Sequence, residues 1–217
     1  QRTGASEEDL KHSLKQIGRA SVQATHTVNQ LLSLARAEGG SAVDMQSCDM
    51  EALIGEVLND SLPRAMDKGL DLGYDGVDTD NKRRFLKIQG NPTLLKEMIR
   101  NLVDNAIHYT PSTEERMGVI TVRLLVDPYS QALAVQVEDN GPGIAAAERE
   151  RIFEPFYRTL GSNVDGSGLG LPIVREIAQR HGATVSVDLA HPGQTPPGAC
   201  FTIRFARASN KFKTSMV

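Results

Sequence analysis

The sequence has no tryptophan, only two cysteines and no long hydrophobic run. No stretch approaches the roughly 18 consecutive apolar residues of a membrane-spanning helix, and no secretory leader opens the chain. Cys48 and Cys200 lack the spacing of a metal site. We interpret them as reduced structural thiols of a cytoplasmic protein, with a disulfide between them left open. The formal net charge of −3 provides no basic surface for nucleic acid, so we expect no nucleic-acid partner.

What is present divides the chain into a helical first unit, a mixed central domain and a short tail. The 217 residues, of which 40% are hydrophobic and 24% charged, are ordinary for a globular domain with an appendage. We expect the units to span residues 1–40, 41–206 and 207–217. The last segment is polar and basic, which is typical of a frayed terminus.

Residues 6–37 are expected to form one long helix. Ser6 is a candidate N-cap and is followed by acidic residues, which a helix N-terminus favours. The apolar seam alternates steps of four and three and consists of Leu10, Leu14, Ile17, Ser21, Ala24, Val28, Leu31 and Ala35. Such a seam is typical of a coiled coil, and a helix of roughly 45 Å cannot bury it alone. We expect a partner helix from another segment or subunit; the alternative is a terminal helix packed on its own domain.

After a glycine-containing linker the pattern changes to mixed helix and strand. Alternating and β-branched runs predict strands at 43–48, 70–74, 85–88, 119–126, 132–139, 184–189 and 200–205. Capping and apolar periodicity predict helices that begin after Asp49, at Pro92 and at Leu169, the last one ending at His181 before Gly182. This order predicts an α+β fold, a two-layer sandwich with helices on one face of a mixed sheet.

The helix expected after Pro92 carries two asparagines at helical spacing. Asn101, Asn105 and His108 lie at steps of four and three, and Glu97 lies one turn earlier on the same side. Asparagine is a poor helix former, so two on one stripe indicate a functional role. The alternative is a solvated helix face. An amide oxygen is a hard ligand that suits Mg²⁺, whose other ligands are typically waters and phosphate oxygens. Asn105 is therefore the candidate metal ligand, with Asn101 as its support.

The strand expected at 132–139 ends in Asp139, which is followed closely by Gly141 and Gly143. A carboxylate at this point can accept a hydrogen bond from the exocyclic amine of a nucleotide base. The neighbouring glycines remove side chains, so a flat base can approach the backbone. Taken alone, the segment is explained as well by an ordinary Asp-Asn-Gly turn.

A second glycine cluster, Gly166, Gly168 and Gly170, leads directly into a helix. Backbone N–H groups at a helix start bind anions when no side chains cover them, although the spacing matches neither a Walker loop nor a dinucleotide fingerprint. Between the two clusters, residues 153–158 read Phe-Glu-Pro-Phe-Tyr-Arg. The two phenylalanines are candidates for anchoring a movable loop, and Arg158 for reaching a phosphate; the alternative is a hydrophobic turn.

In combination these segments resemble a known family more specifically than any one of them does. Four sequence boxes occur in order at 101–110, 139–144, 153–158 and 166–171. They resemble the catalytic ATP-binding domain of two-component sensor histidine kinases, and the resemblance covers roughly residues 43–205. Residues 28–36 resemble the second helix of that family's dimerisation and phosphotransfer hairpin. The resemblance implies a Bergerat-type ATPase sandwich that binds ATP and Mg²⁺, preceded by one hairpin helix.

The resemblance also implies roles for the residues that match the family's boxes. The implied catalytic residues are Asn101, Asn105, His108 and Arg158. Among them, Asn105 would coordinate the Mg²⁺ that bridges the ATP phosphates. The implied nucleotide-binding residues are Asn105, His108, Tyr109, Asp139, Gly141, Gly143, Ile144, Phe153, Phe156, Gly166, Gly168, Leu169 and Gly170. Among these, Asp139 would bind the adenine amino group, and Phe153 and Phe156 would anchor an ATP lid over residues 145–167.

The family's phosphoacceptor box is missing from this sequence. In the family, a histidine is followed by an acidic residue and, a few positions later, by a proline, whereas here Ser13 follows His12 and Thr27 follows His26. We therefore expect the phosphoacceptor to lie outside this chain, which would bind ATP without phosphorylating itself. The implied partners are a cognate response regulator and a second copy bound through the helical hairpin. The implied parent lies in the bacterial inner membrane through upstream segments, with this portion in the cytoplasm.

Three other functions remain open at this point. The ATPases of mismatch repair, gyrase and the related chaperone share the implied fold, but they carry a general-base glutamate where this chain has Asn101, which favours phosphotransfer over hydrolysis. Anti-sigma-factor serine kinases are closer relatives but lack an upstream heptad helix. An ATP-sensing or dimerisation module without catalysis agrees with the missing phosphoacceptor box.

Overall fold

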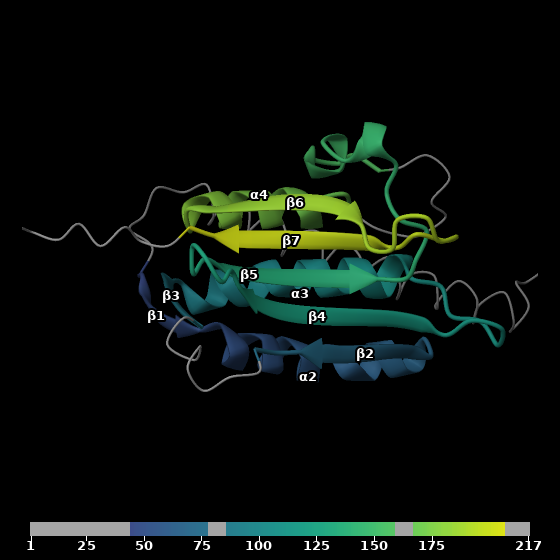
Figure 1. The fold of residues 1–217 in the computed structure, drawn as a ribbon, viewed down its shortest axis with the longest axis horizontal. Coiled ribbons are helices and arrows are strands. Elements are labelled where there is room, and N and C mark those ends of the chain that lie inside the picture. The colour runs from purple at the N-terminus through teal and green to yellow at the C-terminus, as the bar shows by residue number, and fades with distance from the viewer. Residues whose placement is uncertain (1–43, 78–85, 159–166, 207–217) are drawn as a thin grey trace, which may run out of the picture.

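The structure is a computed structural model that describes residues 44–77, 86–158 and 167–206 (Figure 1). The predicted coiled-coil helix, the tail 207–217 and Gly166 lie outside these ranges. The described residues form α2, α3 and α4, two short 3-10 helices and two sheets. Within them, no helix is both long enough and apolar enough to cross a bilayer.

A five-stranded sheet forms one layer of the fold, in the order β2-β4-β5-β7-β6. Its strands are β2 (Leu70–Asp75), β4 (Gly118–Val126), β5 (Leu133–Asp139), β6 (Ala183–Leu189) and β7 (Ala199–Phe205). β2 pairs with β4 in parallel, whereas all other neighbours are antiparallel. The predicted mixed sheet is confirmed. β4 and β5 form a hairpin in which Ile120 lies opposite Asp139.

The helices cover one face of this sheet, as predicted (Figure 1). They are α2 (Met50–Asp67), α3 (Pro92–Tyr109) and α4 (Gly170–Arg180). Their apolar sides and the inward residues of the strands form one hydrophobic core, in which Leu102, Ile120 and Ile177 are fully buried. The α+β sandwich predicted from the sequence is therefore correct.

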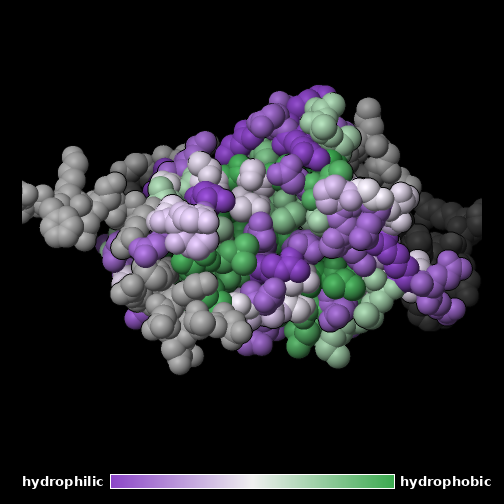
Figure 2. All heavy atoms as spheres, viewed as in Figure 1, coloured by the Kyte–Doolittle hydropathy of each residue, from purple (hydrophilic) through white to green (hydrophobic). Residues whose placement is uncertain are grey.

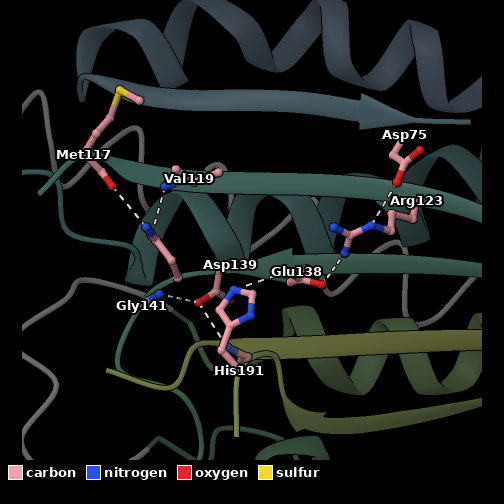
Figure 3. Close-up of polar contacts among 10 residues, drawn as sticks. Asp75, Met117, Val119, Arg123, Glu138, Asp139, Gly141 and His191 are labelled. Atoms are coloured by element: carbon pink, nitrogen blue, oxygen red, sulfur yellow. Dashed lines mark hydrogen bonds and ion pairs between the residues drawn. The ribbon is translucent and has the colours of Figure 1, made fainter. Parts of the chain in front are cut away.

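The other face of the sheet carries polar side chains, as the two-residue alternation of a half-buried strand requires. On β5, Val137 is buried in the core while the next residue, Glu138, faces outward. Figure 2 shows polar side chains over the middle of this face. Arg123 of β4 forms ion pairs there with Glu138 and with Asp75 of β2 (Figure 3). This network ties together strands that are distant in the sequence.

Two of the predicted strands differ from expectation. The strand predicted at 43–48 is β1 (Gln46–Asp49), and the strand predicted at 85–88 is β3 (Lys87–Gly90). They pair with each other as a separate antiparallel ribbon, so β2 and β3 belong to different sheets. Alternation of residue types locates a strand but does not identify its neighbour, which explains this difference.

Ion pairs hold α3 beside α2. Each joins residues 40 positions apart, so the two helices run parallel and in register. The pairs are Glu56–Lys96 at 3.0 Å, Asp60–Arg100 at 2.6 Å and Arg64–Asp104 at 2.6 Å. Exposed pairs of this kind contribute at most about 1 kcal/mol each, but three in one register specify how α3 lies. Lys68 extends the series by donating to the Ile107 carbonyl at 3.0 Å.

Candidate nucleotide site

Helix α3 begins at Pro92, as the sequence predicts, and Asn91 is its N-cap. The Asn91 side chain accepts the N–H of Leu94 at 3.0 Å, and Pro92 occupies the first helical position. The helix ends at Tyr109, because Thr110 is extended. These two ends determine where the predicted polar stripe falls on the helix.

Asn101 of α3 is buried, with only 8% of its surface exposed. Its Nδ2 donates to the Glu97 carbonyl oxygen at 2.9 Å and to Glu97 Oε1 at 3.2 Å. Burial excludes the solvated-face alternative for this residue. One turn later, Asn105 is half-buried, and within the described ranges no group hydrogen-bonds its amide. Asn105 therefore has its oxygen available for a ligand.

The end of α3 opens onto a cavity of about 470 Å³. His108 is exposed and Tyr109 half-buried, and their ring centroids lie 6.1 Å apart. The lining residues are Lys68, His108, Tyr109, Thr110, Pro111, Ser112, Pro142 and Pro196. Pro142 lies in the glycine loop after Asp139. The end of α3 and this loop therefore line one cavity. Asp139 lies next to this cavity and is not among its lining residues.

Asp139 ends β5 and is buried, with 6% of its surface exposed. Its Oδ1 accepts hydrogen bonds from the N–H groups of Gly141 at 2.8 Å and Ala199 at 3.3 Å (Figure 3). No described residue donates to the other oxygen, Oδ2. Burial raises the pKa of this carboxyl, and the two backbone hydrogen bonds oppose the rise. A buried carboxylate held through one oxygen is suited to accept a ligand's N–H through the other.

Gly198, between β6 and β7, fixes the loop after Asp139, and the sequence analysis did not single it out. Its φ is +68°, and a Cβ at this position would lie 2.1 Å from the Asp139 carbonyl oxygen, so only glycine fits. The Gly198 N–H donates to the Gly141 carbonyl at 2.9 Å, and Gly143 lies against the Gly198 carbonyl. The pair Pro197-Gly198 indicates a turn in the sequence, but nothing there indicates contact with Asp139.

Asn140 is a second residue that the sequence analysis missed. Its Oδ1 accepts the Val119 N–H at 2.9 Å, and its Nδ2 donates to the Met117 carbonyl at 3.0 Å. Figure 3 shows these hydrogen bonds at the start of β4. The side chain therefore acts as an additional strand residue, which fastens the outer side of the loop while Asp139 points into the core.

The first part of the predicted lid joins the domain through Phe153. It contains the 3-10 helices η2 (Ala146–Glu148) and η3 (Arg151–Phe153). The Phe153 ring is 5% exposed and packs edge-on against Phe201 of β7, with centroids 6.4 Å apart. The Arg175 guanidinium of α4 lies 4.5 Å from the same ring centroid. Phe153 is thus in the place that a lid anchor would occupy.

Phe156 does not make the anchoring contact that the sequence predicts. Its side chain is 66% exposed, because a φ of +64° turns it away from the core. Its backbone N–H instead donates to the Gly168 carbonyl at 2.9 Å. A Cβ on Gly168 would lie 2.8 Å from the Phe156 Cα, so this close backbone contact requires glycine. Residue type alone does not distinguish the two phenylalanines.

The remaining predicted residues lie just before the predicted lid, within it and at the start of α4. Leu169 is fully buried, and Gly170 is the first residue of α4. Ile144 is partly buried against the core, and Arg158 is exposed. Gly166 lies outside the described residues. Asn101, Asn105, His108 and Tyr109 come from one helix, so the site residues are drawn from α3, the loop after β5 and the start of α4.

These residues fit a nucleotide with Mg²⁺. In the ranges that the structure describes, no three His, Cys, Asp or Glu side chains cluster as a metal site. A metal there would rest on the open amide of Asn105 and on ligand phosphates, which is how Mg²⁺ commonly binds with nucleotides. The Asp139 carboxylate supplies the matching acceptor for a base amine. The donor set therefore suits both ends of ATP.

His181 has a structural role. Its Nε2 accepts the N–H of Asn91 at 3.0 Å, and its Nδ1 donates to the Ile177 carbonyl at 2.7 Å. Burial lowers its pKa, which favours this neutral form. Both ring nitrogens are thereby used within the fold.

Both cysteines, Cys48 and Cys200, are free thiols, and burial raises the pKa of Cys48.

Comparison with known proteins agrees with this geometry. The family described as histidine kinase-, DNA gyrase B- and HSP90-like ATPase matches residues 90–209. Over 186 residues the chain is 32% identical to the sensor protein kinase PmrB of Pseudomonas aeruginosa, an alignment that covers 84% of this chain and 36% of that protein. The chain spans about a third of the length of the curated relatives that it matches.

Solved structures give the same result. The mycobacterial sensor histidine kinase MprB aligns with a TM-score of 0.61 at 30% identity, over 74% of this chain and 96% of that one. The histidine kinase ShkA in complex with AMPPNP aligns with a TM-score of 0.70 at 26% identity, over 95% of this chain and 41% of that one. The chain belongs to the family of histidine kinase-, DNA gyrase B- and HSP90-like ATPases, on the branch formed by the catalytic domains of sensor histidine kinases.

Proposed function

We propose that this chain is the ATP-binding catalytic portion of a sensor histidine kinase, which transfers the γ-phosphoryl group of ATP to a histidine. The observation that carries the proposal is the Asp139 carboxylate, which is buried at the end of β5 and held by backbone N–H groups through one oxygen only. An adenine amino group supplies a donor for the second oxygen. Guanine presents a carbonyl at the equivalent ring position, and that oxygen would be repelled.

The other end of the nucleotide is assigned to α3 and the start of α4. Asn105 would hold Mg²⁺ through its amide oxygen, with Asn101 beside it. Bound Mg²⁺ neutralises the charge on the phosphates as the γ-phosphoryl group leaves. His108 and Arg158 are exposed near the ends of their segments, and we assign both to the phosphates. The backbone N–H groups around Gly168 would add an anion site at the helix start.

The proposed nucleophile is the imidazole of a histidine that does not belong to this chain. The domain positions ATP, and the imidazole attacks the γ-phosphorus in line. The phosphoryl group then passes to an aspartate of a cognate response regulator. A second copy of the chain, bound through the helical hairpin, and a parent protein in the bacterial inner membrane belong to the same proposal. Support comes from the sensor kinases that the chain resembles.

Direct ATP hydrolysis is the weaker alternative. It needs a general base for water, and the gyrase-type relatives carry a glutamate where this chain has Asn101. The Asn101 amide cannot remove a proton from water. An ATP-sensing module without phosphotransfer remains the second candidate, since the sequence lacks the phosphoacceptor box.

The metal assignment is tested by the Asn105→Ala variant. We expect it to bind Mg²⁺–ATP about tenfold more weakly, because it loses an inner ligand, while ATP affinity in EDTA stays unchanged. Calorimetric titration with and without Mg²⁺ measures both. Equal losses under the two conditions would remove Asn105 from metal binding.

The site of phosphorylation is tested with γ-labelled ATP. Because the proposed phosphoacceptor lies outside this chain, no label should be found on the chain after incubation with ATP and Mg²⁺. Phosphohistidine is acid-labile, so acid treatment should also release no label. Acid-labile label that disappears in the His12→Ala or His26→Ala variant would place the phosphoacceptor within this sequence and would overturn that part of the proposal.

A further inference from the structure

The charged side chains of α3 divide between two stripes of the helix. Lys96, Arg100 and Asp104 all pair with residues of α2. Glu97 lies on the neighbouring stripe, in line with Asn101 and Asn105. Among the described residues, no lysine, arginine or histidine pairs with the Glu97 carboxylate, and its one hydrogen-bond partner is Asn101. A carboxylate whose partner is an amide rather than a cation needs a separate explanation.

The hydrogen bonds to Glu97 determine which way the Asn101 amide faces. An asparagine Nδ2 carries two N–H donors. One donates to the Glu97 carbonyl oxygen at 2.9 Å and the other to Glu97 Oε1 at 3.2 Å. Both partners can only accept, so the flipped amide would bring oxygen against oxygen. With Nδ2 turned toward these two acceptors, the Asn101 Oδ1 points away from Glu97.

We propose that Glu97 is a positioning residue for the metal–nucleotide site. It fixes the buried Asn101 amide so that Oδ1, and never Nδ2, faces the site beside Asn105. Residues four apart on a helix are neighbours, about 6 Å apart, so the two amide oxygens lie on one stripe. An oxygen there can hold Mg²⁺ or one of its waters, whereas an N–H₂ group would repel the cation. This inference rests on the proposed function and assigns a new residue to it.

The competing explanation is an ordinary pairing between adjacent helix turns. Such a pair stabilises a helix slightly and has no influence on a metal. The two explanations differ in what happens when the carboxylate is replaced by a group that accepts, donates or does neither. Glu97→Gln keeps an acceptor oxygen, Glu97→Ala removes it, and Glu97→Lys offers a donor that draws the amide oxygen away from the site.

The binding experiment titrates each variant with ATP, in Mg²⁺ and in EDTA. We expect Glu97→Ala and Glu97→Lys to weaken Mg²⁺–ATP binding by about tenfold or more, the size typical of residues that orient metal ligands, with ATP in EDTA unchanged. Glu97→Gln should remain within about threefold of the wild type. Glu56→Ala is the matched control, since it removes a glutamate of similar helical setting that pairs with Lys96. Unchanged Mg²⁺–ATP binding in both Glu97→Ala and Glu97→Lys would overturn the inference.

A second measurement does not depend on the nucleotide. The side-chain N–H₂ resonances of Asn101 in the ligand-free protein report whether both protons are hydrogen-bonded. We expect slow exchange with water in the wild type and in Glu97→Gln, and fast exchange in Glu97→Ala. Equal exchange in all three would show that Glu97 does not hold the amide. Failure of the wild type to bind ATP, with the amide protected as expected, would instead refute the proposed function.

Discussion

The two glycine-rich segments that frame the proposed nucleotide site are held in different ways. The loop after Asp139 is fixed by hydrogen bonds of Gly141 and Gly198, by the Asn140 side chain and by a contact that leaves no room for a Cβ. The described part of the proposed lid buries Ile152 and the Phe153 ring, whereas Phe156 faces solvent. Ion pairs also join it to β6 and α4, between Arg149 and Asp188 and between Glu150 and Arg175. The proposed base pocket is therefore held mainly by hydrogen bonds and close backbone contacts, and the described part of the proposed lid by buried side chains and ion pairs.

The largest effect should come from adding one methyl group to the base pocket. Gly198→Ala would place a Cβ against the Asp139 carbonyl and should destabilise the domain by about 4 kcal/mol or more. Gly193→Ala is the control in the same connection: its φ is +90°, but its added Cβ meets nothing within 4 Å, so it should cost only about 1–2 kcal/mol. Urea unfolding measures both. Equal losses would show that strain at φ, rather than the contact, requires glycine at 198.

The next effect separates the two phenylalanines of the lid. Phe153→Ala removes the contacts with Phe201 and Arg175 and should destabilise the protein by about 3 kcal/mol. Phe156→Ala should stay within about 0.5 kcal/mol of the wild type, because the ring is exposed. The same denaturant titration compares them. A loss in Phe156→Ala as large as in Phe153→Ala would mean that both rings anchor the lid, as the sequence suggested.

The smallest effect concerns the cost of burying Asp139. Burial raises the pKa of Asp139 in the folded protein. The protonated carboxyl therefore stabilises the folded state fully below the ordinary pKa of about 3.9, and this stabilisation is lost as the pH rises through the pKa of the folded protein. The uncharged Asp139→Asn variant should therefore melt roughly 2–4 °C higher than the wild type at pH 7 without nucleotide. The difference should shrink as the pH falls. A variant that melts lower than the wild type at pH 7 would contradict this account.

Features set by neighbours in sequence were predictable. The N-cap Asn91 with Pro92, the hairpin of β4 and β5, and the end of α3 before Pro111 follow from local backbone preferences. The burial of one phenylalanine and the exposure of the other did not follow, because the outcome depends on a positive φ at Phe156. Residue type carries no information on that angle.

Contacts between distant segments were the harder part. The pairing of β1 with β3 and the contact of Gly198 with Asp139 join residues far apart in the chain. A single sequence shows a glycine in a turn but not what that turn touches. Glu97 was predictable only in part. Its spacing placed it on the stripe of Asn101, but only the hydrogen bonds show which end of the Asn101 amide it holds.

The most direct test of the account is a calorimetric titration of the wild-type chain and of Asp139→Asn with ATP and with GTP in the presence of Mg²⁺. The account predicts that the wild type binds ATP at least about 100-fold more tightly than GTP, since the site is built to receive a base N–H. It also predicts that Asp139→Asn loses about as much ATP affinity as this difference. Equal affinity for the two nucleotides, or an Asp139→Asn variant that binds ATP like the wild type, would contradict it.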